Sequence, residues 1–385
     1  MSKLEELFTK LCPNGVEYKF LEEIFNTRNG YTPSKNKKDF WENGVIPWFR
    51  MEDIRVNGRI LNAALQYVSR EALKGKAFPK NSIIIATSAT IGEHALVTVE
   101  SLANQRFTYL MLKDEYKDRF DIKFIYYYCF RLDEYCLACL NQGNFASVDM
   151  KKFVKFKFPL PPLEVQREIV RILDNFTELT AELTAELTAR KKQYEYYRDS
   201  LFKFEISIPK VMLSDMVTIK RGTRVVRNQL MGIGRYPVYQ NSMKPLGYYE
   251  KSNCPANTTF IISAGAAGEI GYSYNDFWAA DDCFYLECSK SLKARYLYYA
   301  LLCQKNYISS RVRKASIPRL DRLVVERLEI PVPSISEQER IVSVLDRFDM
   351  LCNDLSSGLP AEIEARQKQY EYYRDKLLMF KELSE

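Results

Sequence analysis

The chain has 385 residues, 46% of them hydrophobic and 27% charged. This suggests two to three folded domains and excludes disordered, collagen-like and disulfide-framework proteins. No apolar run reaches the roughly 18 to 20 residues that span a bilayer, so we expect a cytoplasmic protein without membrane contact. Lys and Arg number 56 against 49 Asp and Glu, and the resulting charge of +7 is compatible with a polyanionic partner.

The first predicted globular region covers residues 1–160. It opens with a short amphipathic helix over residues 1–12, which could complete the last helix of the chain from its other end. A strand-like segment, Ser82–Ile85, precedes an aromatic helix near Phe124, and this order predicts an α+β domain.

Histidine and cysteine usage lowers the expectation of an enzyme. His94 is the single histidine of the chain, and most general-base and zinc sites need histidine. We expect His94 on a loop or the surface. The nine cysteines do not form paired metal-ligand motifs, and Cys129, Cys136 and Cys139 are expected to be reduced core thiols.

A long helical spacer is predicted over residues 161–204. Pro161 and Pro162 precede it, and apolar residues then recur every three or four positions, which is typical of one long amphipathic helix. Two TAEL units fill residues 180–187. They are explained equally well by sequence slippage or by a ruler in which each unit adds about 6 Å, near the length of two base pairs.

The second predicted globular region, residues 205–333, carries the densest positive charge. Six basic residues and no acid lie between Lys220 and Tyr249. Basic residues contact phosphates, whereas Gln and Asn side chains can bind adenine edges. The candidate DNA-binding residues from both regions are Arg28, Thr32, Ser34, Lys35, Lys37, Lys38, Lys220, Arg221, Arg224, Arg227, Tyr239, Gln240, Asn241, Arg311, Arg313 and Lys314.

A distal helical region is predicted over residues 334–385, with a break at Ser356–Gly358 before Pro360. The two helical regions are copies of each other. KQYEYYRD occurs at 192–199 and again at 368–375, and Gln166 recurs as Gln338 after similar proline-rich entries. The candidate coiled-coil or subunit-docking residues are Gln166, Ile169, Phe176, Leu183, Leu187, Tyr194, Tyr197, Ile341, Phe348, Tyr370 and Tyr373.

The repeat predicts a fold. We expect an α+β tandem duplication with pseudo-two-fold symmetry, in which two long helices pack as an antiparallel coiled coil and separate two globular α/β domains. The tyrosine clusters then have two interpretations: they pack the two helices against each other, or they form a docking surface present twice for two copies of a partner.

Several motifs together resemble the DNA-specificity (S) subunits of bacterial type I restriction-modification systems. They are PLPPLEVQREIV at 159–170, PVPSISEQERIV at 331–342, the TAEL units, GLPAEI at 358–363, the twin KQYEYYRD blocks, and NGYTPS at 29–34 with Pro47-Trp48 downstream. The resemblance covers nearly the whole chain.

The resemblance implies that residues 1–160 and 205–333 are target-recognition domains, each binding one half of a split site on double-stranded DNA. It implies a non-catalytic chain that holds two methyltransferase (M) subunits and joins restriction (R) subunits in the bacterial cytoplasm. No cofactor is then expected in this chain, because S-adenosylmethionine, ATP and Mg belong to the partner subunits.

Three alternatives remain at this point. The chain could serve another modification or nuclease system with the same duplicated plan, which its partners would reveal. A self-contained methyltransferase or nuclease would bind S-adenosylmethionine or cleave DNA unaided, and the chain lacks NPPY/NPPF-type motifs. A purely structural coiled-coil scaffold would not need the basic stretch after Lys220.

Overall fold

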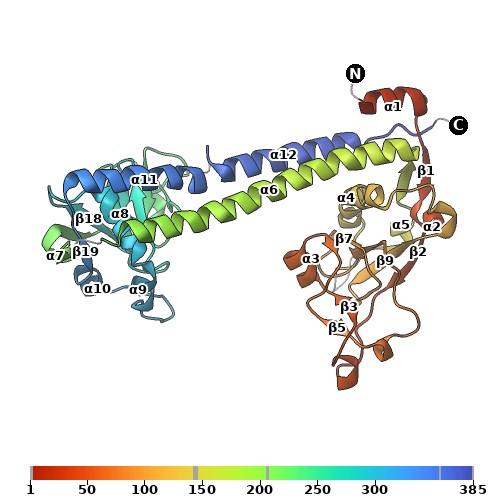
Figure 1. The fold of residues 1–385 in the computed structure, drawn as a ribbon, viewed down its shortest axis with the longest axis horizontal. Coiled ribbons are helices and arrows are strands. Elements are labelled where there is room, and N and C mark those ends of the chain that lie inside the picture. Colours follow the sequence, from red (N-terminus) through yellow and green to blue (C-terminus); the bar gives the residue numbers. More distant parts are fainter. Residues whose placement is uncertain (1–2, 142–145, 205–207, 355–356, 384–385) are drawn as a thin grey trace. The chain divides into compact units, whose positions relative to one another are not determined.

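The computed structural model describes residues 3–141, 146–204, 208–354 and 357–383 (Figure 1). The chain divides into two compact units. Unit 1 comprises Met1–Ala181 and Ala365–Glu385, and unit 2 comprises Glu182–Glu364. Each unit therefore combines a globular part with segments of the long helices.

Unit 1 is built on a five-stranded sheet of order β2-β9-β6-β7-β4, a three-stranded sheet β5-β3-β8 and the pair β1-β10. Most neighbouring strands are antiparallel, and β3-β8 and β4-β7 are parallel. Its elements are α1 (Lys3–Leu11), β1 (Glu17–Phe20), α2 (Leu21–Ile24), β2 (Phe25–Asn29), η1 (Lys38–Phe40), β3 (Ile46–Phe49), α3 (Met51–Asn57), β4 (Ile60–Leu61), β5 (Tyr67–Val68), η2 (Arg70–Ala72), β6 (Ser82–Ala86), β7 (His94–Val97), β8 (Leu102–Ala103), β9 (Phe107–Leu112), η3 (Asp114–Tyr116), α4 (Ile122–Ala138), α5 (Met150–Phe153) and β10 (Lys157–Leu160).

The core of unit 1 follows from its apolar runs. Every residue of β6 is buried, as expected for a central strand rich in β-branched residues. Helix α4 begins where the Asp121 side chain accepts a hydrogen bond from the Lys123 amide at 2.8 Å, and it packs its aromatic residues on the sheet. Cys129, Cys136 and Cys139 are free and buried, which confirms the prediction of core thiols.

Unit 2 repeats this plan. Its sheets have the orders β12-β18-β15-β16, β14-β13-β17 and β11-β19, which match those of unit 1 strand for strand apart from the edge strand β4. The elements are β11 (Lys210–Met212), α7 (Leu213–Met216), β12 (Val217–Arg221), η4 (Arg227–Gln229), β13 (Tyr236–Tyr239), β14 (Gly247–Tyr249), β15 (Thr258–Ile262), β16 (Ile270–Ser273), β17 (Trp278–Ala279), β18 (Cys283–Cys288), α8 (Ala294–Cys303), α9 (Lys305–Ser310), α10 (Arg322–Glu326) and β19 (Glu329–Pro331). The tandem duplication and the α+β class are therefore confirmed.

Three helices make up the two helical regions that contain the KQYEYYRD blocks: α6 (Leu163–Leu201), α11 (Ile335–Asn353) and α12 (Leu359–Leu377). In unit 1, Phe176 of α6 stacks on Tyr373 of α12 with ring centroids 5.6 Å apart. In unit 2, Tyr197 of α6 stacks on Phe348 of α11 at 5.4 Å. Each half of α6 thus packs against a helix from the other repeat.

The predicted helix break lies between α11 and α12. Helix α11 ends at Asn353 and α12 begins at Leu359, immediately after Gly358. Leu355 and Ser356, which also belong to the predicted apolar stripe and break, lie outside the described residues. Neither these helices nor any other helix among the described residues combines the length and the hydropathy required to cross a bilayer.

Two sequence expectations were wrong. His94 lies in β7 rather than on a loop or the surface, and it is fully buried like every other residue of that strand. Its Nδ1 is hydrogen-bonded to the Asp133 carboxylate at 2.6 Å. Helix α1 does not continue α12, which ends at Leu377. It packs beside the C-terminal segment instead, with Phe8 5.7 Å from Phe380.

Candidate nucleic-acid interface

Two adjoining hollows in unit 1 bring together a group of basic, aromatic and amide side chains. Their volumes are about 510 and 300 Å³, and both are lined by Lys35, Trp48 and Arg50. The first is completed by Lys38, Trp41, Glu42 and Gln66, and the second by Thr32, Met51, Glu52, Asn104, Gln105 and Arg106. We call this combined surface the unit 1 groove.

Two tryptophans support the unit 1 groove. The rings of Trp41 and Trp48 meet edge to face with centroids 4.9 Å apart. Trp48 Nε1 donates to the Tyr31 carbonyl at 3.1 Å, and Trp41 Nε1 donates to the Ser34 carbonyl at 3.1 Å. The tryptophans therefore fix the loop that carries the predicted residues Thr32, Ser34 and Lys35.

Four chain segments line this groove: residues 32–42, residues 48–52, Gln66, and residues 104–106. The Thr32 hydroxyl donates to Gln105 Oε1 at 2.6 Å and so joins the loop after β2 to the loop after β8. Arg50 follows β3 directly, and its amide donates to the buried Asp53 carboxylate at 2.7 Å. Its guanidinium carbon lies 5.5 Å from the Trp48 ring centroid, within the range of a cation–π contact.

The remaining basic candidates of unit 1 lie on the surface beside aromatic rings. Arg28 on β2 lies 4.1 Å over the Phe78 ring, and Lys37 lies 5.0 Å from the Phe40 ring. Lys38 stands in η1 and lines the unit 1 groove with Lys35. Basic side chains exposed in this way are suited to contact phosphate oxygens.

In unit 2, the structure brings Asn241 next to the basic loop between α9 and α10. The Asn241 carbonyl accepts from the Ala266 amide at 2.9 Å, and the neighbouring Gly265 amide donates to Pro318 at 3.1 Å. The same loop is closed by backbone bonds between Arg313 and Arg319 at 2.8 and 3.2 Å. Arg311, Arg313 and Lys314 are exposed on this loop.

The basic residues that begin at Lys220 differ in whether the structure gives them a hydrogen-bond acceptor. Lys220 Nζ pairs with Glu287 across β12 and β18 at 2.8 Å, and Arg221 Nε donates to the Asp281 carbonyl at 2.6 Å. Arg224 and Arg227 are exposed and pair with no acidic side chain among the described residues. Arg224 and Arg227 are thus the stronger phosphate-contact candidates.

Tyr239 is held inside unit 2. Its ring stacks on Phe260 at 4.8 Å and meets Phe277 at 5.6 Å, so it fills the space beneath β13. Burial raises the pKa of its hydroxyl. This packing leaves the next residue, Gln240, as the polar side chain at the end of the strand.

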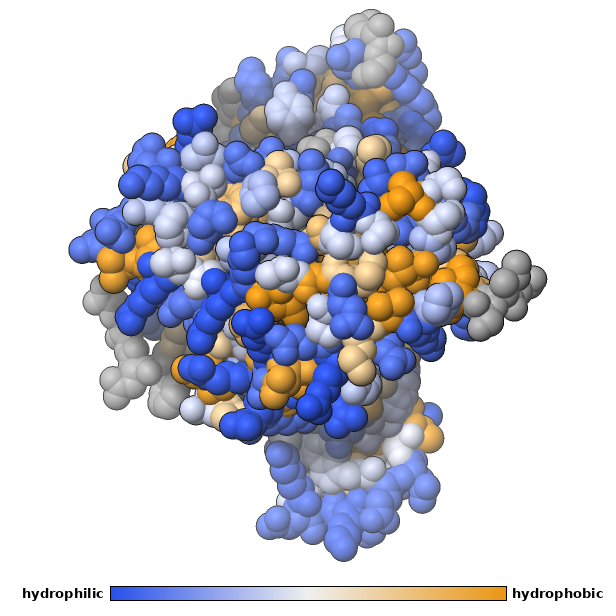
Figure 2. Space-filling view, turned by 90° about the vertical axis from the view of Figure 1, so that its left-hand side faces the viewer, coloured by the Kyte–Doolittle hydropathy of each residue, from blue (hydrophilic) through white to orange (hydrophobic). Residues whose placement is uncertain are grey.

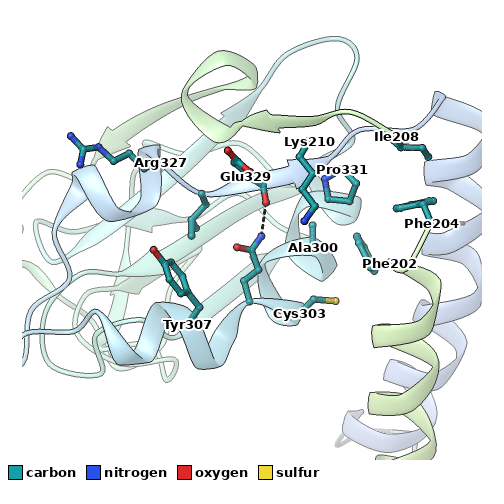
Figure 3. A pocket seen from close by; sticks show the side chains of 12 residues that line it. Phe202, Phe204, Ile208, Lys210, Ala300, Cys303, Tyr307, Arg327, Glu329 and Pro331 are labelled. Carbon is teal, nitrogen blue, oxygen red and sulfur yellow. Dashed lines mark hydrogen bonds between the residues drawn. The ribbon is translucent and has the colours of Figure 1, made fainter. Parts of the chain in front are cut away.

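The face of unit 2 shown in Figure 2 is mostly hydrophilic, and its hydrophobic side chains gather in a band across the middle. Another hollow of unit 2, about 770 Å³, lies where α6 leads into β11 (Figure 3). Phe202, Phe204 and Tyr307 line it together with Lys210, Arg327 and Glu329, and Gln304 Nε2 donates to the Glu329 carbonyl at 2.9 Å. Its mixed lining differs from the unit 1 groove, where four cations gather.

The helical candidates separate into buried and exposed groups. Gln166, Ile169, Tyr194 and Ile341 are buried, whereas Phe176, Leu183, Leu187, Phe348 and Tyr370 are half-buried. Tyr197 and Tyr373 are exposed by 41% and 37% although each stacks on a phenylalanine. The candidates predicted from the sequence did not include their neighbours Tyr196 and Tyr372, which are exposed by 69% and 62%.

Sequence reasoning also missed part of the unit 1 groove, namely Arg50, Gln66, Asn104, Gln105 and Arg106. One signal pointed to Arg50. It stands three residues after Pro47, as Gln240 stands three residues after Pro237. The described residues contain no cluster of three or more His, Cys, Asp or Glu side chains arranged to hold a metal ion.

The chain matches the sequence profile described as "Type I restriction modification DNA specificity domain" twice, over residues 13–190 and 207–365. It is 42% identical over 377 residues to the type I restriction enzyme EcoprrI specificity subunit of Escherichia coli, covering 92% of this chain and 93% of that protein. A putative type I restriction enzyme specificity subunit of Haemophilus influenzae is 32% identical over 69% of this chain and 74% of its own length.

Solved structures share the fold. The S subunit of a type I restriction-modification system from M. genitalium matches with a TM-score of 0.59 and 18% identity over 94% of this chain and 95% of that one. A chain from a study of complex assembly and conformational transition of the type I R-M system matches with a TM-score of 0.63 and 17% identity, over 96% and 98%.

Proposed function

Because the chain belongs to the type I restriction-modification DNA specificity family, we propose that it is the sequence-recognition subunit of such a system. It binds an asymmetric, bipartite site on double-stranded DNA, and it carries out no chemical step itself. Unit 1 binds one half-site and unit 2 binds the other.

One observation carries this proposal: the two units share a strand order but differ in the polar side chains of their loops. Unit 1 has Gln105 and Arg106 where unit 2 has Asp281 and Asp282, at the same distance before β9 and β18. Arg and Gln donate to purine edges, and Asp accepts from the amino group of cytosine. Two domains with one fold and different loops suit two different half-sites.

Phosphate contacts supply affinity in this proposal. Lys35 and Lys38 border the unit 1 groove, and Arg224, Arg227, Arg311 and Arg313 are exposed in unit 2. Cations that contact phosphates position a protein on DNA without reading its sequence. Base specificity then depends on the side chains at strand ends and loops.

The helical regions hold the partner subunits. The exposed pair Tyr196 and Tyr197 recurs as Tyr372 and Tyr373, so one surface is present twice. Two copies of a methyltransferase subunit dock there, and restriction subunits join the assembly. S-adenosylmethionine, ATP and Mg bind to those subunits, and the complex works in the bacterial cytoplasm.

The test is a single-base map of N6-methyladenine in the source bacterium with the gene intact and deleted. We expect the deletion to abolish methylation at one bipartite motif and to leave other motifs unchanged. The intact gene, returned on a plasmid, should restore that motif. If deletion removes no motif while the partner methyltransferase is expressed, the proposed function is wrong.

A further inference from the structure

The ends of β3 and β13 place Arg50 and Gln240 at the same backbone position of the two units. In unit 1, Phe49 pairs with Ala103 in the parallel ladder of β3 and β8. In unit 2, Tyr239 pairs with Ala279 in the parallel ladder of β13 and β17. Arg50 and Gln240 are the next residues along the chain.

Backbone hydrogen bonds beside these positions are also equivalent. The Asn104 amide donates to the Phe49 carbonyl at 3.0 Å, and the Ala280 amide donates to the Tyr239 carbonyl at 2.9 Å. Each strand end is therefore tied to the loop that leads into β9 or β18. The two side chains leave the same rigid element although they differ in chemistry.

A glycine in each unit holds the adjacent loop close to this element. A Cβ atom on Gly30 would lie 2.4 Å from the Ala103 and Asn104 carbonyl oxygens. A Cβ atom on Gly222 would lie 2.2 Å from the Ala280 oxygen and 2.3 Å from the Ala279 oxygen. Only glycine permits this approach, and it brings the loops after β2 and β12 beside Arg50 and Gln240.

The backbone of Arg50 is fixed, whereas its guanidinium makes no hydrogen bond to an acidic side chain among the described residues. Its amide is fixed by Asp53, and its Nε is buried without a hydrogen-bond acceptor among the described residues. The Glu52 carboxylate lies 3.9 Å from Nε, beyond hydrogen-bond distance. The guanidinium is thus held over Trp48 at the centre of the unit 1 groove with its terminal donors available.

Gln240 likewise has side-chain hydrogen-bonding groups that are available to bind a base. Its Nε2 approaches Asp281 Oδ1 at 3.5 Å, the limit of a hydrogen bond, and its Oε1 accepts no hydrogen bond from a described residue. The side chain is half-buried at the strand end, and the Tyr239 ring beneath it is packed. A planar amide in this position offers one donor and one acceptor side by side.

We propose that Arg50 and Gln240 are equivalent base-reading residues, with Arg50 binding a guanine in the half-site of unit 1 and Gln240 binding an adenine in the half-site of unit 2. The inference rests on the proposed function. Arg donates two hydrogen bonds to O6 and N7 of guanine, whereas Gln exchanges a donor and an acceptor with N6 and N7 of adenine. The residue at this equivalent position, Arg50 or Gln240, then determines one base of the half-site that its unit binds.

The experiment exchanges the two side chains in the complete modification system. Arg50→Gln and Gln240→Arg are expressed separately in cells that lack the native gene, and N6-methyladenine is mapped at single-base resolution. We expect Arg50→Gln to replace one guanine by adenine in one half-site, and Gln240→Arg to replace one adenine by guanine in the other. The gap and all other bases stay unchanged. The preference at the exchanged base should shift on the order of 10- to 100-fold.

Two further variants make the test specific. Arg50→Lys keeps the charge but loses the planar fork, so it should relax the guanine preference at that one base. Lys38 lines the same groove. Lys38→Gln should lower the extent of methylation while every base of the motif is retained. If a variant does not methylate, the purified complex is used to select DNA from a randomised library, and the bound sequences are read directly.

The possible failures are distinct. If the wild-type system has no bipartite motif, the proposed function is wrong. If the wild type has one and Arg50→Gln retains every base of it, the base-reading inference is wrong and the proposed function stands. A variant complex that assembles yet selects no sequence also overturns the inference, because loss of one base contact leaves the others in place.

Discussion

Gln166 and Gln338 make the same three hydrogen bonds in the two units, each from a fully buried side chain. Gln166 Nε2 donates to the Pro161 and Arg119 carbonyls at 2.7 and 2.8 Å, and its Oε1 accepts from the Asp121 amide at 2.8 Å. Gln338 bonds Pro333, Ser291 and Lys293 at 2.9 Å each. Each glutamine ties the start of a long helix to the loop before an aromatic helix.

Replacement of Gln166 by leucine should therefore destabilise unit 1 without touching a binding surface. The change removes the hydrogen-bond partner of two carbonyls and one amide around a side chain that is fully buried, and we expect a loss of about 2–4 kcal/mol in the free energy of unfolding. Gln338→Leu should do the same in unit 2. Urea unfolding of the full chain measures both.

Gln367→Leu is the matched control, because Gln367 is exposed on α12. It should change stability by less than about 0.5 kcal/mol. Equal effects of Gln166→Leu and Gln367→Leu would show that the buried hydrogen bonds contribute nothing.

Local patterns explain what could be predicted from the sequence. The start of α6 and the break before α12 follow from proline, glycine and apolar spacing, which act over a few residues. The duplication was visible because Gln166 and Gln338, and the KQYEYYRD blocks, recur in order. These signals determine the order of the elements but not the contacts between distant segments.

Distant contacts explain what was missed. His94 is buried in β7, where it meets Asp133, which lies 39 residues further along the chain. Lys220 seemed free in a run without acids, yet β18 brings Glu287 beside it. Gln105 reaches the unit 1 groove only because β8 pairs with β3. Single-sequence patterns do not contain strand pairings of this kind.

The exposed arginines of unit 2 should contribute to DNA affinity in a salt-dependent way. Arg224→Ala and Arg227→Ala remove cations that have no acidic partner among the described residues, and each loss of a phosphate contact lowers the slope of log K against log salt by about 0.9. Titration of the purified complex with DNA at several salt concentrations gives the slope. Lys220→Ala is the control and should change the slope less, because Glu287 already pairs with Lys220. Slopes that stay at the wild-type value in both arginine variants would remove these residues from the interface.

The exposed tyrosines of the helical regions should bind the methyltransferase subunits. Tyr196→Ala removes a ring that is 69% exposed, so the chain should fold normally and retain one methyltransferase subunit instead of two. Tyr372→Ala should remove the other copy. Native mass spectrometry counts the subunits, and Tyr196→Phe, which keeps the ring, should retain both. Two bound subunits in both alanine variants would instead favour the interpretation that the tyrosines only pack the helices.

The number of TAEL units should set the gap between the half-sites. A third unit after residue 187 adds four residues to α6, or about 6 Å of helix. We expect the gap in the methylated motif to widen by one or two base pairs while both half-sites keep their bases. Insertion of four alanines at the same point should widen the gap by the same amount if only the length of α6 determines it. A motif with an unchanged gap would favour slippage as the origin of the repeat.

The ion pairs of Glu168 should make unit 1 sensitive to acid. Glu168 is buried at the start of α6, where Arg171 at 2.7 Å and Lys3 of α1 at 2.9 Å lower its pKa to about 2. A carboxylate whose pKa is lower in the folded chain adds stability above its unfolded value near 4.5, and this stability is lost as the pH falls towards 2. Glu168→Gln should therefore lower stability by about 1–2 kcal/mol at pH 7 and by much less near pH 2. Thermal unfolding from pH 7 to 2 tests this, with exposed Glu164→Gln as the control, and a difference between wild type and Glu168→Gln that is independent of pH would contradict the assignment.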